Sequence, residues 1–169
     1  MILLTLLAIG AGISSAQLNY YRTRASAETF FWDLRRIQET ARARGFGASP
    51  HGIKLYQGRI DSRSGAIEPV GFSYLVYGVN ASPIPPDALA ALSTVQRGEL
   101  VALSPTVLVC ADAVTSPAGV PSGTDLQFNA TGTLVGTGAT FLDLLDPAVG
   151  YFRVRFWNRT QIQLEFVSL

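Results

Sequence analysis

The sequence is poor in the side chains that build reactive sites. It contains one cysteine, Cys110, one histidine, His51, and one lysine, Lys54, among 169 residues. A single cysteine excludes an intramolecular disulfide, and a single imidazole leaves a zinc site or a hydrolytic triad short of partners. The sequence has no GxSxG, HExxH or CxxC pattern, and no glycine-rich phosphate loop follows a strand. We therefore expect neither an enzyme nor a bound metal or cofactor.

Cys110 and His51 have plain structural interpretations. Cys110 lies in TVLVCADA, a short apolar run typical of a buried strand, in which a thiol is an inert core side chain. His51 lies in GASPHG, which we expect to form a loop. A lone histidine outside any motif is more often structural or solvated than catalytic.

Charged residues are also scarce. They make up 15% of the chain, against about a quarter in typical soluble domains, which favours extensive burial or association. The net charge is +1, so the molecule as a whole does not attract nucleic acid. The arginines are unevenly spread, because six of them lie within residues 17–45, which contain only three acidic residues.

Residues 25–44 predict an amphipathic α-helix. Apolar side chains recur at spacings of three and four and form one stripe of Ala27, Phe30, Phe31, Leu34, Ile37 and Ala41. Acidic residues stand three positions before arginines in the pairs Asp33–Arg36 and Glu39–Arg42, each worth about a few tenths of a kcal/mol. Gly45 suits the left-handed position that ends a helix.

The first sixteen residues, Met1–Ala16, carry no charge. ISSA resembles a signal-peptide cleavage site, but nothing basic precedes the apolar run. The run falls short of the roughly 20 residues of a membrane span unless Gln17–Tyr21 is added, which places two tyrosines at the membrane interface. Residues 17–24 contain neither proline nor glycine, so we expect one helix from Met1 to Arg44. Such a rod is about 66 Å long, too long for one small domain to bury throughout.

Beyond Gly47 the pattern changes to strands and turns. Apolar and aromatic residues between turn residues predict strands over residues 52–58, 71–78, 99–104, 106–113, 125–129, 139–145, 151–157 and 160–167. The proline-rich stretch after residue 80 is expected to hold a short helix capped by Asp87 and closed by Gly98. In residues 151–157 apolar residues alternate with arginines, which indicates a half-exposed strand.

The expected fold class is α+β, with a long N-terminal helix packed on a C-terminal antiparallel β-sheet domain. The chain then has three parts. Residues 1–24 are the apolar half of the helix, residues 25–45 its amphipathic half, and residues 46–169 a β-rich globular head.

The first 45 residues resemble the N-terminal region of type IV pilins and type II secretion pseudopilins. The closest likeness is to the H-type pseudopilin and FimT group of minor subunits, in which the helix often ends in a pattern like L..AR..A..RG. LRRIQETARARG approximates that pattern. The tails of the group show F...G and then a final hairpin, as in FNATG followed by YFRVRFWNRTQIQLEF.

The resemblance implies a pilin-like fold and a structural role. In that family a peptidase removes a basic leader and residue 1, here Met1, is methylated. The subunit is held in the inner membrane with its head outside the cytoplasm, and then joins other pilin or pseudopilin subunits in a periplasmic or cell-surface filament. The helix residues that pack in the filament core correspond here to Ile2, Leu3, Leu4, Thr5, Leu6, Leu7, Ala8, Gly10 and Gly12.

Two residues depart from the family pattern. The family nearly always has Glu at position 5, where it is thought to neutralise the N-terminal amine of a neighbouring subunit, whereas this chain has Thr5. An ammonium buried without a partner is costly, and in the family this omission is typical of the subunit at the filament tip. Arg22 replaces a common helix-breaking proline, so any loosening of the helix comes instead from Gly10, Gly12 and the serines that follow.

Two other functions remain open. FimT-like DNA receptors carry Gly-Arg-x-Arg near the C terminus, and the matching NRTQ keeps Arg159 but has Gln161 in place of the second arginine. Arg153 and Arg155 on the neighbouring strand extend this to a small basic strip, although such arginines are more often the solvated face of an edge strand. The simpler alternative is a membrane-anchored β domain that never polymerises.

Three of the four asparagines, Asn80, Asn129 and Asn158, begin an N-x-Ser/Thr sequon. They are candidate glycosylation sites of a surface filament, although in most bacteria these triplets carry no modification. An intact-mass measurement distinguishes the two cases.

Overall fold

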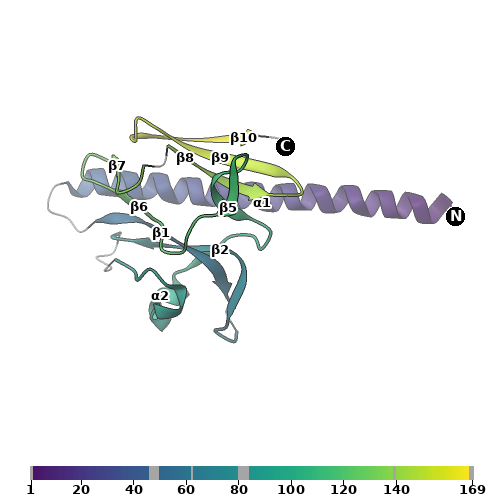
Figure 1. Ribbon diagram of the computed structural model, residues 1–169, viewed down its shortest axis with the longest axis horizontal. Coiled ribbons are helices and arrows are strands. Elements are labelled where there is room, and N and C mark those ends of the chain that lie inside the picture. The colour runs from purple at the N-terminus through teal and green to yellow at the C-terminus, as the bar shows by residue number, and fades with distance from the viewer. Residues whose placement is uncertain (1, 46–49, 62, 80–83, 139, 168–169) are drawn as a thin grey trace.

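Helix α1 (Ile2–Arg44) is one unbroken helix of 43 residues, about 65 Å long. The computed structural model describes residues 2–45, 50–61, 63–79, 84–138 and 140–167, and for residues 2–14 it describes the backbone alone. In Figure 1 the first part of α1 projects beyond the domain, while its second part lies along the sheets. The continuous helix expected from the sequence is therefore confirmed.

The rest of the chain forms two five-stranded sheets in which all paired strands are antiparallel. One sheet has the order β3-β2-β1-β6-β7, with β1 (His51–Ile60), β2 (Ile67–Tyr77), β3 (Val101–Ala102), β6 (Asp125–Phe128) and β7 (Leu134–Val135). The other has the order β10-β9-β8-β4-β5, with β4 (Leu108–Asp112), β5 (Ser116–Gly119), β8 (Phe141–Asp146), β9 (Gly150–Trp157) and β10 (Gln161–Val167). The α+β class is confirmed.

One hydrophobic core joins α1 to both sheets. Five of the six residues of the apolar stripe are at most 2% exposed: Ala27, Phe30, Leu34, Ile37 and Ala41. They pack in one cluster with β1 and β6 residues such as Leu55 and Leu126, and with β8 and β9 residues such as Leu144 and Val154. Each of the larger side chains, such as Phe30 and Leu34, stabilises the fold by about 1.5–3 kcal/mol. The second half of α1 is thereby part of the domain.

The end of α1 follows the sequence expectation. Gly45 has φ +66°, and its N–H donates to the Ala41 carbonyl at 3.3 Å. Glycine adopts this left-handed conformation without a steric penalty, which turns the chain out of the helix. The ion pairs Asp33–Arg36 and Glu39–Arg42 are both present.

The stretch after residue 80 differs from its prediction. Asp87 caps no helix, because its carboxylate accepts a hydrogen bond from Lys54 at 2.6 Å on the outer face of the first sheet. The chain instead forms a 3₁₀ turn, η1 (Leu89–Ala91), and then α2 (Thr94–Gly98), which is capped by Ser93. Leu89 and Leu92 both pack in one cluster with Tyr56 of β1. A short 3₁₀ turn, and not a longer α-helix, brings both leucines to this strand.

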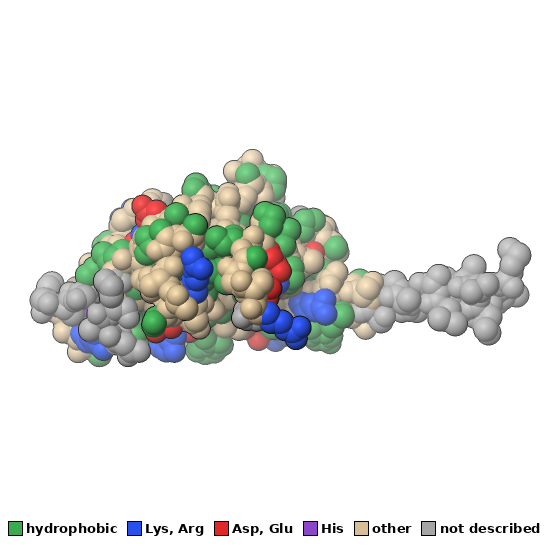
Figure 2. All heavy atoms as spheres, turned by 90° about the horizontal axis from the view of Figure 1, so that it is seen from below, with side chains coloured by type: hydrophobic (Ala, Val, Ile, Leu, Met, Phe, Trp, Pro, Cys, Tyr) green, Lys and Arg blue, Asp and Glu red, His purple; other side chains and the backbone are tan. Residues whose placement is uncertain are grey.

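Several strand boundaries also differ. β3 and β4 are shorter than predicted, and β5 and β7 lie in segments that we expected to be loops. His51 is the first residue of β1 and is buried, so the loop expected there was wrong. Figure 2 shows that the face seen from below carries hydrophobic and neutral side chains with few charges, in keeping with the low charge content.

Candidate functional site

The described side chains of α1 change from exposed to buried near the middle of the helix. Residues 15–18 are exposed, and Leu18 retains 48% of its surface. Thr23 is the first fully buried side chain in the described part of the helix. The head therefore holds α1 from about residue 20 onward, and the preceding turns extend away from it (Figure 1).

The side chains of all the residues expected in the filament core lie outside the described part of the structure. Met1 is outside the described residues, and Ile2, Leu3, Leu4, Thr5, Leu6, Leu7, Ala8, Gly10 and Gly12 are described only as helical backbone. Within the part of the chain that the structure describes, we find no helix with an apolar stretch long enough to cross a membrane. The sequence-based assignments for residues 1–14 therefore stay predictions.

Polar contacts fix the middle of α1 to both sheets. The Thr23 hydroxyl lies 2.9 Å from the Asn19 carbonyl and 3.3 Å from Asp146 Oδ2, at the end of β8. On the other sheet the Tyr74 hydroxyl donates to Asp33 Oδ2 at 2.7 Å. Burial, and then the hydrogen bond to Asp33, raises the pKa of Tyr74, so its phenol stays protonated.

The last turns of α1 hold two loops of the head. Gln38 Nε2 donates to the carbonyls of Gly132 and Thr160, at 2.7 and 2.9 Å, and Gln38 is buried. Arg42 donates to Thr131 and Thr160 carbonyls. Gly132 has φ +71°, and a Cβ there would overlap the Arg42 side chain. The glycine of the FNATG pattern therefore lets the loop reach the helix.

Arg153 is held in an ion pair and is not a solvated arginine. It donates through Nε and Nη2 to the two carboxylate oxygens of Asp143, both at 2.8 Å. Asp143 is 0% exposed and also accepts from the Ala113 N–H at 2.7 Å. The guanidinium carbon lies 3.8 Å from the Phe141 ring centroid and 5.3 Å from that of Tyr151. The bonds to Asp143 raise the pKa of Arg153 further.

The other two candidate arginines differ from Arg153. Arg155 is half-buried, lies 3.4 Å from Glu165 and stacks over the exposed Trp157. We expected Arg153 and Arg155 on an edge strand, but β9 lies inside its sheet, between β10 and β8. Arg159 is exposed at the β9–β10 turn with φ +60°, and the structure gives its side chain no ion pair within the described residues.

A groove lies between α1 and the β9–β10 hairpin. Its volume is about 470 Å³, and it is lined by Arg35, Gln38, Arg42, Trp157, Thr160, Gln161, Ile162 and Gln163. The side chain of Trp157 is fixed by a hydrogen bond to Gln163 at 2.9 Å. Sequence analysis missed this site because its arginines come from the helix. The excess of arginine in residues 17–45 was the available signal.

A second polar cluster lies on the outer face of the first sheet and was also missed. Lys54 is 5% exposed and contacts Asp87 at 2.6 Å and Asp125 at 3.9 Å. The Tyr77 hydroxyl donates to Asp125 at 2.6 Å. Burial, followed by this hydrogen bond, raises the pKa of Tyr77. The cluster ties the stretch around Asp87 to the sheet, and the lone lysine within an apolar strand was the sequence signal.

The three sequons differ in their surroundings. Asn80 lies outside the described residues. Asn129 is exposed, but its Oδ1 accepts from the N–H groups of Thr131 and Thr133. Asn158 is exposed in the β9–β10 turn with φ +48°. Their modification stays a prediction.

The described residues hold no group of three or more histidine, cysteine, aspartate or glutamate side chains that would bind a metal ion. Cys110 is buried as expected, and burial raises the pKa of its thiol to about 12, so it is a poor nucleophile. No protein-family model, curated protein or solved structure matches this chain. Its function is therefore inferred from its own residues.

Proposed function

We propose that this chain is a structural subunit, of the minor kind, in a type IV pilus-like or type II secretion filament. The observation that supports the proposal is α1, a single helix that belongs to the head through its second half and extends beyond it through its first. The first sixteen residues of that helix are uncharged in sequence. An apolar helical arm outside its own domain needs a membrane or other helices around it.

The proposed mechanism is assembly. The apolar arm is held in the inner membrane, is extracted, and then packs with equivalent helices in the filament core. Ala8, Gly10 and Gly12 are small and allow close approach of helices. The head stays attached to the helix during assembly, because hydrogen bonds of Gln38 and Asp33 fix the second half of α1 to both sheets.

Thr5 bears on the position of the subunit. It supplies no carboxylate to a neighbouring N-terminal amine, which favours the tip, where no such neighbour is present. Thr5→Glu tests this position. If the subunit occupies the tip, the variant enters filaments at internal positions and its number per filament rises, whereas an unchanged number contradicts a tip position.

The experiment that tests the proposal is incorporation into filaments in the native host. Gly10→Leu with Gly12→Leu is expected to abolish recovery of the chain in sheared or purified filaments, because bulky side chains separate the helices. Leu3→Ile, which conserves volume, serves as the matched control. Unaffected recovery of the double variant contradicts the packing mechanism. Absence of the wild-type chain from all filaments supports the simple membrane-anchored domain.

DNA binding is the second candidate function, and the groove beside α1 favours it. Arg35 is exposed, and Trp157 is 46% exposed, so a cation and an aromatic ring face the same hollow. Arg159 lies next to this lining in the chain. Phosphate contacts combined with base stacking are how proteins bind single strands without sequence preference. Arg153 is excluded from this role by its ion pair with Asp143.

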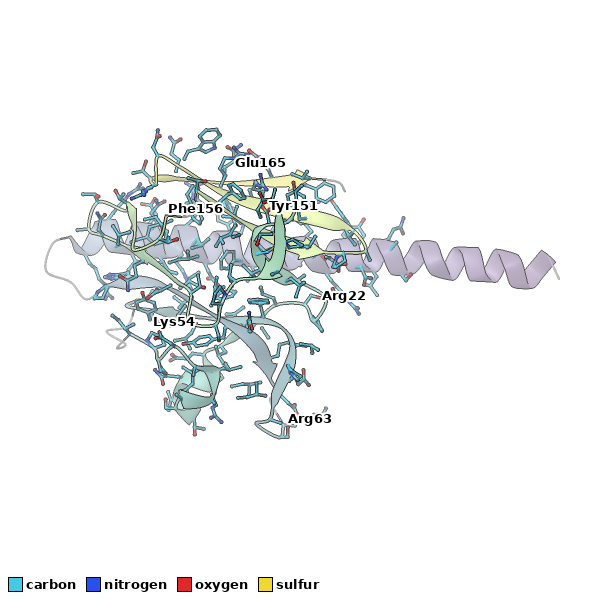
Figure 3. The ribbon with its side chains drawn as sticks, viewed as in Figure 1. Arg22, Lys54, Arg63, Tyr151, Phe156 and Glu165 are labelled. Carbon is cyan, nitrogen blue, oxygen red and sulfur yellow. The ribbon has the colours of Figure 1, made fainter. Side chains whose placement is uncertain are left out.

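A mobility-shift titration of the full chain in detergent tests this candidate. Arg35→Gln and Arg159→Gln are each expected to weaken binding and to lower the slope of log affinity against log salt by about one. Arg63→Gln is the control, because Arg63 is exposed on the distant β1–β2 turn (Figure 3). Absent or salt-insensitive binding contradicts the function.

A further inference from the structure

An exposed aromatic patch surrounds the point at which α1 leaves the head. Leu18, Tyr21 and Phe166 keep 48%, 63% and 45% of their surface exposed, although they come from the first helix and the last strand. The half-buried Tyr20 joins them, because its ring centroid lies 5.6 Å from that of Tyr21 and 5.4 Å from that of Phe166. We name these four residues, with Arg22, the exit collar.

The collar carries uncompensated positive charge. Arg22 is exposed there (Figure 3), and within the described residues it forms no ion pair. The neighbouring Arg24 is paired with Glu28 at 2.7 Å. Asp146 is 1% exposed and accepts from the Ala148 N–H, so its carboxylate is directed into the protein. Arg22 follows Tyr21 directly in the helix, and aromatic rings at the same level of a helix as an unpaired arginine are suited to a surface that is apolar on one side and anionic on the other.

The length of the helix places the collar at a defined depth. A bilayer hydrocarbon layer about 30 Å thick is spanned by about 20 helical residues. The uncharged part of α1 before Arg22, residues 2–21, has that length. The collar then lies at the headgroup level, where tyrosine is favoured and arginine meets lipid phosphate. Phe166 lies at the same level because it contacts Tyr20.

We propose that the exit collar is a lipid-contact surface that seats the head on the membrane before assembly, with Arg22 on the phosphate of an anionic phospholipid. This inference rests on the membrane stage of the proposed function. It adds that the last strand, and not the helix alone, touches lipid. Two contacts on separate elements, Tyr21 on α1 and Phe166 on β10, fix both the depth and the tilt of the head.

Depth-dependent quenching of tryptophan in the full chain, reconstituted in phosphatidylcholine–phosphatidylglycerol vesicles, tests the inference. Tyr21→Trp and Phe166→Trp are each placed in a chain whose native Trp32 and Trp157 are replaced by Phe. The quenchers are lipids brominated in the upper acyl chain. Native Trp157, kept alone, is the control, because it lies five residues from the Phe152–Phe166 register pair, about 17 Å along the strand.

We expect both probes to lose fluorescence to the brominated lipid, and Trp157 to lose none. If only the Tyr21→Trp probe is quenched, the helix spans the membrane but the head stands away from it, which overturns the collar and leaves the proposed function intact. If neither probe is quenched, both fail. If the Phe166→Trp probe is shielded from aqueous iodide only at high protein concentration, a second copy covers the patch, which also overturns the inference.

The role of Arg22 has its own readout. The head is expected to prefer phosphatidylglycerol to phosphatidylcholine, and Arg22→Gln should lower this ratio of affinities by about fivefold. The ratio is measured as quenching of the Phe166→Trp probe in vesicles of varied lipid composition. Arg24→Gln is the matched control, since Arg24 is already paired with Glu28. Equal effects of the two variants contradict the phosphate contact.

Discussion

Replacing Arg153 by methionine tests the ion pair that separates it from the other candidate arginines. Asp143 is 0% exposed, and Arg153 donates to both of its carboxylate oxygens at 2.8 Å. In Arg153→Met the buried carboxylate keeps only the Ala113 N–H among these donors. Removal of one partner from a buried pair costs about 3–5 kcal/mol. For a domain of this size, a loss of about 3 kcal/mol lowers the Tm by roughly 6–12 °C.

A double-mutant cycle measures the interaction directly. Asp143→Leu alone leaves the guanidinium between two aromatic rings with only Asp112, 3.5 Å away, as an acidic partner, and we expect a somewhat smaller loss. The double variant carries neither charge, so its loss should be well below the sum of the two single losses. The remaining cost is the unsatisfied Ala113 N–H, about 1–3 kcal/mol. Thermal unfolding of the full chain in mild detergent, followed by circular dichroism, supplies the four values.

Arg155→Met is the control on the same strand. Arg155 and Glu165 are each 33% exposed and lie 3.4 Å apart, so solvent screening leaves this pair worth less than about 1 kcal/mol. If Arg153→Met costs no more than Arg155→Met, or if the two losses in the cycle simply add, then Arg153 has no special structural role. It would then return as a candidate for nucleic-acid binding.

Three further outcomes are expected. Gly132→Ala should destabilise the chain by more than about 1 kcal/mol in urea unfolding, because φ is +71° and a Cβ overlaps Arg42. Gly136→Ala, also at positive φ but in open space, should cost less. Lys54→Met should speed hydrogen exchange in residues 84–93, which Lys54 tethers through Asp87, and unchanged exchange contradicts the tether. The free energy of unfolding should be constant up to about pH 10 and should fall as the pH rises further. Phenolate absorbance, recorded over the same pH range, follows the ionisation of the tyrosines. Burial raises the pKa of three phenols, so the unfolded chain loses these protons first: Tyr56, Tyr74 and Tyr77.

The helix was predictable because its signals are local. Two signals predict the helix: residues 17–24 lack proline and glycine, and the apolar residues recur at spacings of three and four. Both can be read from residues within a few helical turns of one another. Phe31 is the exception within the stripe. It is half-buried and lies at the edge of the core, where its ring contacts the exposed Trp32 at 5.2 Å. The spacing shows which face of the helix is buried. How many residues on that face are fully covered depends on the two sheets packed against it.

The sheet arrangement was less predictable, because short strands are defined by their partners. β5 contains a proline and β7 has two residues, so neither has a propensity that marks it as a strand. Each forms because a neighbouring strand presents unpaired backbone groups along its edge. The division into two sheets likewise follows from long-range pairing, of which alternation along the chain gives no sign.

The alternation in β9 predicted which side of the strand its arginines occupy, but not what they contact there. The alternation in β9 correctly placed Phe152 and Val154 toward the core and Arg153 on the opposite face. It gave no information about what lies across that face, where the register sets Asp143 directly opposite Arg153. Charge on an outward face is free to bind a ligand only if the neighbouring strand carries no opposite charge. The same test retains Arg159 as a candidate for the proposed DNA contact, because the strand that bonds to its carbonyl, β7, has no acidic residue.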